Sequence, residues 1–410
     1  MIFAWVATVS SQLDSSRLVI TFLTAKDNNF SLDSIDSLGS LGSLSIGGTS
    51  ATVVKRYGRR LVLDLGAPFD LEAERARFAG ALRSVQSVET DFLVGVSDVP
   101  LTPLTPQYMV SDALMVLNAT DPNNTNNPNV DGAYISPATQ TPLWNLMDSE
   151  PYSIHAEGVW QVTNSTPDVV VAVLDTGIAD PARSMFLNLL DGYDFISDDG
   201  ISIDGDGRDP DPTDPGDWGD MCPTPSWHGT KVASILAARH DNEFGMKGVA
   251  QNCSVLPVRV LGLCRMGYAT DVTDAIVWAA GGAINGVPAN PSPAKIISLS
   301  LAGQGSCPDY LQSAVTQAVS LGAMVVAAAG NSNQNVSNYF PANCNGVIAV
   351  AASTRDGKLA AYSNWGSLIA VSAPGGDQTN GIMTLGVNSL ETGLEVSFLS
   401  FLLVYCLMSV

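Results

Sequence analysis

The chain is poor in basic residues and in histidine, and its cysteines do not occur as Cys-x-x-Cys pairs. Its 410 residues include 19 lysines and arginines against 40 aspartates and glutamates, which gives a formal net charge of −21, and only 3 histidines. The shortage of positive charge argues against nucleic acid or an anionic membrane as a partner. The spacing of the 6 cysteines does not favour a zinc or thioredoxin-like site.

Long apolar runs are also scarce. The uncharged run Val396 to Val410 is shorter than the roughly 20 residues that span a bilayer. A frameshift, an unspliced intron or a truncated fragment therefore explains it better than a membrane anchor. At the other end, Met1 to Val9 is apolar but lacks the basic residues of a signal peptide. We expect residues 1–16 to be a weak signal-like segment or a mis-called start.

Three segments place polar residues where buried elements begin or end. A β-branched run from Val169 ends in Asp175, and a second apolar run from Val325 leads to Asn331. Between them, His228 precedes apolar residues at helical spacing, which predicts a helix that begins at this histidine. Because parallel sheets bind ligands outside the carboxyl ends of their strands, we expect the three side chains to face one crevice.

These segments resemble the subtilisin-like serine proteases, the subtilases. The resemblance rests on Asp-Thr-Gly at 175–177, His-Gly-Thr at 228–230 and Ala-Gly-Asn at 329–331. It implies that Asp175 orients His228, that His228 shuttles the proton, and that Asn331 donates to the oxyanion. The family's nucleophile lies in a Gly-Thr-Ser-Met-Ala segment after the asparagine, and no such segment follows Asn331 here. The peptidase domain is therefore expected to be incomplete at its nucleophile.

The resemblance also implies substrate contacts and disulfides. A Ser-Leu-Gly-Gly edge in the family pairs with the substrate backbone as an added strand, and Ala302 replaces one glycine of it here. The residues implied to bind substrate are Ser300, Leu301, Ala302, Gly303, Ala329 and Gly330. In secreted bacterial relatives, the equivalent cysteines pair as Cys222 with Cys264 and Cys307 with Cys344. Cys253 and Cys406 are left over.

An acidic, turn-forming run follows the Asp175 strand. Its aspartates are Asp204, Asp206, Asp209, Asp211, Asp214 and Asp217. It is not an EF-hand, because Arg208 stands where a ligand belongs and Pro215 occupies the position of the bidentate glutamate. Clustered oxygen ligands without thiols favour calcium over a transition metal. The alternative is an exposed acidic loop beside the substrate cleft, and no organic cofactor is expected.

Strands expected at 17–23, 60–65 and 85–94 alternate with a helix at 71–84 and a Ser/Gly-rich loop at 31–50. This pattern predicts a small ferredoxin-like α/β domain, which subtilases carry as an inhibitory propeptide. The Gly-Thr-Ser-Ala sequence at 48–51 mimics the missing nucleophile motif, but it lies in this expected propeptide and is read as a coincidence. The expected domains are the propeptide at 17–97, a processing linker and inserted loop at 98–150, the peptidase domain at 151–393 and an aberrant tail at 394–410.

From Val169 onward, alternating strands and helices predict an α/β fold with a doubly wound, mostly parallel sheet. Together with the resemblance, this predicts a secreted, monomeric serine endopeptidase that acts on proteins or peptides and binds its own propeptide. The alternative is a non-catalytic protein, either a peptide-binding pseudoprotease or a propeptide-like inhibitor. A downstream reading frame that encodes Gly-Thr-Ser would favour the first function. A transcript that stops after Val410 would favour the second.

Overall fold

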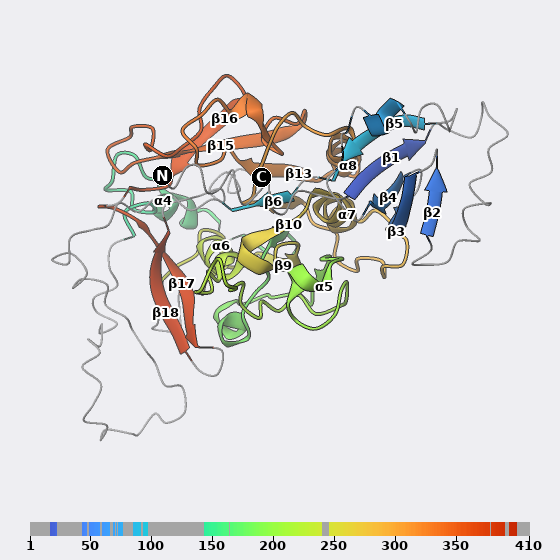
Figure 1. Ribbon diagram of the computed structural model, residues 1–410. Coiled ribbons are helices and arrows are strands. Elements are labelled where there is room, and N and C mark those ends of the chain that lie inside the picture. The colour runs from blue at the N-terminus through green and yellow to red at the C-terminus, as the bar shows by residue number, and fades with distance from the viewer. Residues whose placement is uncertain are drawn as a thin grey trace.

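The structure is a computed structural model whose two largest sheets, among the described residues, have five and seven strands (Figure 1). It describes residues 17–22, 43–46, 49–57, 60–65, 69, 71, 73–76, 85–91, 93–96, 143–163, 165–239, 246–377, 379–389 and 393–399. The expected start at 1–16, nearly all of the expected linker at 98–150, and Cys406 lie outside these residues.

The first sheet is antiparallel, with the strand order β2-β3-β4-β1-β5. Its strands are β1 (Arg17–Phe22), β2 (Ser43–Ile46), β3 (Thr49–Tyr57), β4 (Arg60–Asp64) and β5 (Val85–Thr90). Helical residues at 71 and 73–76 lie between β4 and β5 in the chain. With β1 between β4 and β5, the order is that of a split βαβ unit. Figure 1 shows this sheet, in blue, beside α7 (Ala269–Ala279) and α8 (Asp309–Ser320).

Two details of this region differ from the sequence prediction. The segment expected as a loop at 31–50 contains β2 and the start of β3, so the Ser/Gly-rich composition did not prevent strand pairing. Thr49, Ser50 and Ala51 pair with β2 inside this sheet. The strand expected at 85–94 is broken, because β5 ends at Thr90 and a separate strand, β6 (Leu93–Gly95), pairs with β10 (Met266–Tyr268) of the larger unit.

The second sheet has seven strands in the order β16-β15-β13-β11-β7-β9-β8, and every neighbouring pair is parallel. The strands are β7 (Val170–Asp175), β8 (Tyr193–Asp194), β9 (Ser254–Arg259), β11 (Ile296–Leu299), β13 (Met324–Ala328), β15 (Val347–Ser353) and β16 (Ile369–Pro374). The first strand, β7, lies inside the sheet; β8 and β9 lie on one side of it, and β11, β13, β15 and β16 follow in order on the other. The predicted doubly wound parallel fold is confirmed.

Alternate residues of each strand face opposite sides of this sheet, and helices cover both sides. On one side, Ala172 and Leu174 of β7 belong to the same buried cluster as residues of α7 and α8. On the other side, Val171 and Val173 of β7 pack with α6 (His228–Ala237). This two-sided burial is why the strands read as continuous apolar runs rather than as alternating ones. Among the described residues, no helix is long and apolar enough to cross a membrane.

Shorter elements complete the larger unit. They are α4 (Ala156–Trp160), η3 (Asp180–Met185), α5 (Asp199–Ser202), η4 (Leu263–Arg265), β12 (Gly303–Gln304), η5 (Val336–Asn338), β14 (Tyr339–Phe340), β17 (Ile382–Ser389) and β18 (Gly393–Leu399). β17 and β18 form an antiparallel hairpin, and Leu385 N in β17 donates to Ser234 Oγ of α6 at 3.0 Å. The first residues of the expected tail at 394–410 are therefore part of a paired strand.

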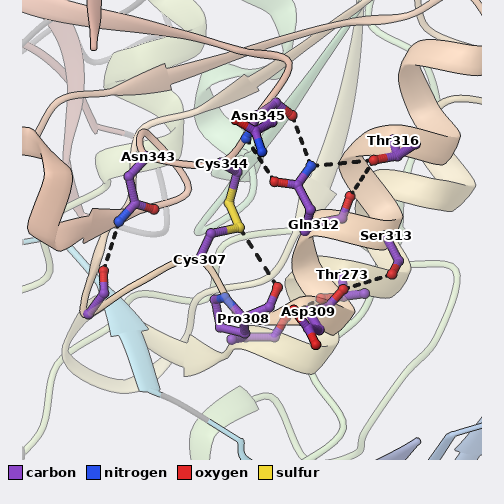
Figure 2. The surroundings of a disulfide bond; sticks show 12 residues. Thr273, Cys307, Pro308, Asp309, Gln312, Ser313, Thr316, Asn343, Cys344 and Asn345 are labelled. Atoms are coloured by element: carbon purple, nitrogen blue, oxygen red, sulfur yellow. Dashed lines mark hydrogen bonds between the residues drawn. A yellow bond between two sulfur atoms is a disulfide. The ribbon is translucent and has the colours of Figure 1, made fainter. Parts of the chain in front are cut away.

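The described residues include two disulfides, and these join the pairs that the family resemblance implies: Cys222 to Cys264 and Cys307 to Cys344. Figure 2 shows how the second one ties the start of α8 to the loop after β14. The Gln312 side chain supports the same junction, since it accepts from Asn345 N at 2.8 Å and donates to Asn345 O at 2.9 Å. Cys253 is buried and forms no disulfide, and burial raises its pKa to about 12.

Candidate active site

The aspartate that ends β7 and the histidine that begins α6 form a hydrogen-bonded pair. His228 Nδ1 lies 2.8 Å from Asp175 Oδ1 and 2.9 Å from Oδ2. Their side chains are 4% and 1% exposed, so little water competes for the contact. Because Nδ1 faces the carboxylate, Nε2 is the ring nitrogen that can reach a reacting group. This arrangement suits general acid–base chemistry.

Close packing requires a glycine in both motifs, Gly177 in Asp-Thr-Gly and Gly229 in His-Gly-Thr. A Cβ at Gly229 would lie 2.3 Å from the carbonyl oxygen of Gly177. Gly177 itself has a φ of +95°, and a Cβ there would lie 2.2 Å from Pro212 O. Only glycine allows such approaches without moving the backbone. The two glycines thus allow the backbone after Asp175 to lie in direct contact with the backbone after His228.

A groove beside the pair brings together residues that the sequence analysis assigned to substrate binding. His228, Ser300, Ala329, Gly330 and Asn331 line it together. Val96, Ala328, Val350, Ala352 and Ser363 complete the lining. Leu301 was also predicted to bind substrate, but its side chain is buried in the hydrophobic core. Of the remaining predicted contacts, Ala302 presents its backbone, and Gly303 starts β12, which pairs with β14.

Sequence reasoning missed Asn364, which holds the loop that carries Asn331. Its side chain is fully buried and donates to Ala329 O at 2.8 Å. Its Oδ1 accepts from Ser332 N at 3.0 Å and Gln334 N at 2.9 Å. The backbone of this loop is therefore hydrogen-bonded by a side chain about 30 residues further along the chain. No local pattern around Asn364 indicates such a long-range role.

A strand from the N-terminal region lies at the edge of the groove. Gly95 and Ala302 exchange backbone hydrogen bonds of 3.1 and 3.0 Å, while β6 pairs with β10 on its other side. Val96 N then donates to Arg265 O at 3.3 Å, and Val96 lines the groove with His228. The segment 93–96 therefore lies as an added strand between two backbone edges, which is how extended peptides bind to exposed sheet edges.

The acidic run does not gather into one site. Asp214 and Asp217 are buried and accept hydrogen bonds from Thr176 and Ser226. Asp204 pairs with Arg259 instead. Within the part of the chain that the structure describes, no group of three or more His, Cys, Asp or Glu side chains is placed to hold a metal ion. The six carboxylates as they stand therefore do not fit a single calcium site, and calcium binding stays a prediction.

Burial shapes the electrostatics beneath the site. It raises the pKa of Asp214 to about 7, while the hydrogen bond from Thr176 acts in the opposite direction because it stabilises the carboxylate. Burial also raises the pKa of Asp194 to about 7, and the nearby Arg259 guanidinium opposes this shift. The floor of the acidic region is thus water-poor, and its carboxylates depend on specific donors.

Comparison with known proteins places these features in a family. A sequence model of the Subtilase family matches residues 166–397, a range that extends four residues past the expected boundary at 393. The chain is 51% identical over 214 residues to an extracellular protease of Xanthomonas campestris, covering 50% of this chain and 37% of that protein. It is 44% identical over 248 residues to an extracellular basic protease of Dichelobacter nodosus, covering 58% of this chain and 40% of that protein.

A solved structure agrees with this comparison. A protease structure from Pseudoalteromonas arctica matches with a TM-score of 0.58 and 42% identity, covering 63% of this chain and 80% of that one. The chain spans about two fifths of the length of the two sequence relatives above. The family match itself includes more than half of the 410 residues. The resemblance is confirmed, and the chain belongs to the subtilase family of serine proteases.

Proposed function

We propose that this chain is part of a secreted serine endopeptidase in which Asp175 and His228 are two members of the catalytic triad. The observation that carries the proposal is the buried 2.8 Å contact between these side chains at the edge of the groove. Asp175 holds the imidazole in one orientation, and His228 takes the nucleophile's proton and passes it to the leaving amine. The extracellular relatives support secretion.

Asn331 is the proposed oxyanion donor. It lines the groove together with His228, which supports a role beside the reacting carbonyl of a substrate. A donor aimed at the developing negative charge stabilises the transition state more than the ground state. In subtilisin, which is the reference case for this effect, removal of such a donor costs roughly 3 kcal/mol in the transition state.

The nucleophile has to come from a segment that these 410 residues lack. Ser363 lines the groove, but its hydroxyl lies between two backbone groups, accepting from Ala352 N and donating to Asn364 O, both at 3.0 Å. Among the described residues, neither Ser300 nor Ser363 is hydrogen-bonded to the His228 ring. A Gly-Thr-Ser segment brought to the groove would supply the missing hydroxyl.

Sequencing of the transcript across and beyond the codons for residues 386–410 tests this proposal. We expect a Gly-Thr-Ser-Met-Ala segment in another frame or after an intron, and we expect its protein product to cleave a fluorogenic peptide. A transcript that stops after Val410, with a stable but inactive protein, would favour the second candidate, a peptide-binding pseudoprotease or inhibitor. The strand at 93–96 supports that candidate, because its backbone pairs with β10 and with Ala302 as an added strand at the edge of the groove.

The N-terminal region is proposed to be an inhibitory propeptide. Its strand at 93–96 lies at the edge of the groove, which Val96 lines together with His228. It also caps two helices whose own N-cap residues, Tyr268 and Pro308, offer no side-chain hydrogen bond. Asp91 accepts from Thr270 N at 3.1 Å and Thr270 Oγ1 at 2.7 Å, and Glu89 accepts from Asp309 N at 3.0 Å.

Replacement of Asp91 by alanine is expected to weaken the hold of the N-terminal region on α7. A lost helix cap costs about 0.5–2 kcal/mol, so the two parts should separate roughly 2- to 30-fold more readily once the connecting segment is cut. Gel filtration after limited proteolysis measures this separation. Asp168→Ala, at an exposed position before β7, is the matched control. Equal retention of the region in both variants would contradict the capping role.

Calcium is proposed for the outer part of the acidic run. Burial raises the pKa of Asp209, and the neighbouring carboxylates of Asp206 and Asp204 add to this shift. Asp204 is paired with Arg259, and the three described side chains as placed do not form a metal site, so calcium binding would require them to rearrange. Saturating calcium at about 100 times its Kd would stabilise the folded state by about 2.7 kcal/mol, which raises Tm by about 5–10 °C. Thermal unfolding with calcium or with EGTA measures this shift. Asp206→Asn should reduce this shift. A Tm that is the same with calcium and with EGTA would contradict the proposed site.

A further inference from the structure

The last two aspartates of the acidic run lie beneath the two motifs of the catalytic pair rather than in a common metal site. Asp214 is 1% exposed and Asp217 is 2% exposed. We propose that both are positioning residues, with Asp214 holding the loop that carries Asp175 and Asp217 holding the helix start that carries His228. This proposal rests on the proposed function of that pair, and neither aspartate is among the residues that line the groove.

Asp214 has a hydrogen-bond donor on each carboxylate oxygen. Its Oδ2 accepts from Thr176 Oγ1 at 2.6 Å, and its Oδ1 accepts from Gly216 N at 2.9 Å. Its own N–H donates to Ile178 O at 3.2 Å, so the backbone is also joined to the Asp175 loop. An asparagine at this position would turn an NH2 group toward one of these donors. The site therefore requires a group that accepts on both sides.

Thr176 connects Asp214 to both members of the catalytic pair. The Thr176 hydroxyl donates to Asp214, and its lone pairs are left to accept. They accept from Gly229 N, next to His228, at 2.9 Å. The Thr176 N–H donates to Asp175 Oδ1 at 2.8 Å. One threonine thus fixes the residue beside the base and orients the acid itself.

Asp217 acts on the histidine from the other side through Ser226. Its Oδ2 accepts from Ser226 Oγ at 2.7 Å, and its Oδ1 accepts from Ser226 N. Ser226 Oγ in turn accepts from the backbone N–H of His228 at 3.2 Å. This bond matters because the residue between them, Trp227, has a φ of +52° and gives α6 no side-chain cap. Asp217 and Ser226 take over that capping function.

The loop that carries Asp217 is itself fixed in place. Cys264 N donates to Asp217 O at 2.7 Å, and the disulfide from Cys264 to Cys222 closes the same loop. Arg265 Nε lies 3.6 Å from Asp217 Oδ2 and balances part of its charge. Both oxygens of Asp214 and of Asp217 are therefore directed at protein donors. This separates them from the outer aspartates of the run, for which calcium is proposed.

The test reads the Asp175–His228 hydrogen bond directly by NMR of the full chain with ¹⁵N-labelled histidine. The chain has 3 histidines, so the His228 signals are identified by their loss in His228→Gln. In the parent we expect a downfield Nδ1–H resonance that is protected from exchange with water. We expect Asp214→Asn and Asp217→Asn to lose this protected resonance. Asp220→Asn, an exposed aspartate of the same region, is the control that should retain it.

Variants of Thr176 decide the matter if a buried aspartate variant fails to fold. Thr176→Val removes the hydroxyl at similar volume and should lose the protected Nδ1–H resonance. Thr176→Ser keeps the hydroxyl and should retain that resonance. Folded variants, judged by near-ultraviolet circular dichroism, that keep the parent His228 signals would overturn the proposal. The NMR signal does not depend on hydrolysis. A protein that is inactive even with a nucleophile segment would refute the proposed function but leave this result readable.

Discussion

Replacement of His228 by alanine, in a product that carries the Gly-Thr-Ser segment, is expected to lower kcat/KM by about four to six orders of magnitude. That is the range known for the removal of triad members in subtilisin, where the members act as a unit. The physical reason lies in the pair itself. Without the imidazole, no group beside the nucleophile accepts its proton, and Asp175 is left buried without its partner. Hydrolysis of a fluorogenic peptide at saturating and limiting concentrations measures the loss.

His155→Ala is the matched control, because this histidine is exposed and lies outside the motifs at the start of α4. It should leave kcat/KM unchanged. The 410-residue chain itself should hydrolyse the peptide no faster than its own His228→Ala variant. If His228→Ala kept a hundredth or more of the parent activity, the role of His228 as the catalytic base would be wrong.

Replacement of Arg259 by methionine is expected to lower the free energy of unfolding by about 3–5 kcal/mol. Arg259 ends β9, its side chain is 1% exposed, and it pairs with both Asp194 and Asp204 while donating to Ser202 O. Methionine has a similar length but no charge. The variant would therefore leave the fully buried Asp194 carboxylate without its cation, which costs more than the pair itself contributes. Chemical denaturation measures the change.

The pH dependence of this effect has a definite sign. The pKa of Asp194 is raised from 3.8 to about 7 in the folded protein, so this group favours folding at low pH, and its contribution is lost as the pH rises from about 4 through 7. Arg259 holds that pKa down, so its loss raises the pKa further. The stability gap between parent and variant should be widest above pH 7 and narrower near pH 5.

The control for this prediction is a charge pair of the same chemistry on the surface. Lys358 pairs with Asp356, and their side chains are 80% and 58% exposed. Lys358→Met should give no measurable change in stability, because water solvates both partners when the pair is broken. An Arg259→Met variant as stable as Lys358→Met would show that the buried network is not needed for the fold.

The strands and helices of the peptidase unit could be predicted from the sequence because the hydrophobic patterns that indicate them are local. The run that ends in Asp175 forms β7, and the helix expected at His228 begins at that residue. Both reflect side-chain periodicity over a few residues, which does not depend on distant parts of the chain. The loop expected at 31–50 shows the limit of composition, since β2 is stabilised by pairing with β3 rather than by its own residues.

Contacts between distant segments could not be predicted in this way. Nothing near Asp91 indicates that it caps a helix 179 residues further along, and nothing near Asn364 indicates that it holds the Asn331 loop. The acidic run is the clearest case, because six similar aspartates in one turn-rich stretch predict one shared site. The fold distributes them, with Asp204 on Arg259 and Asp214 on Thr176.

The sequence by itself determined the family, the parallel α/β architecture and the identity of Asp175, His228 and Asn331 as the polar residues at the sheet's edge. Each follows from a short motif or from periodicity within one element. Only the tertiary structure decided which hydroxyl or carboxylate supports Asp175 and His228, and which strand lies at the edge of the groove beside them. The physical reason is that a buried polar group takes whatever donor the packed chain brings within about 3 Å, and sequence distance does not limit that choice.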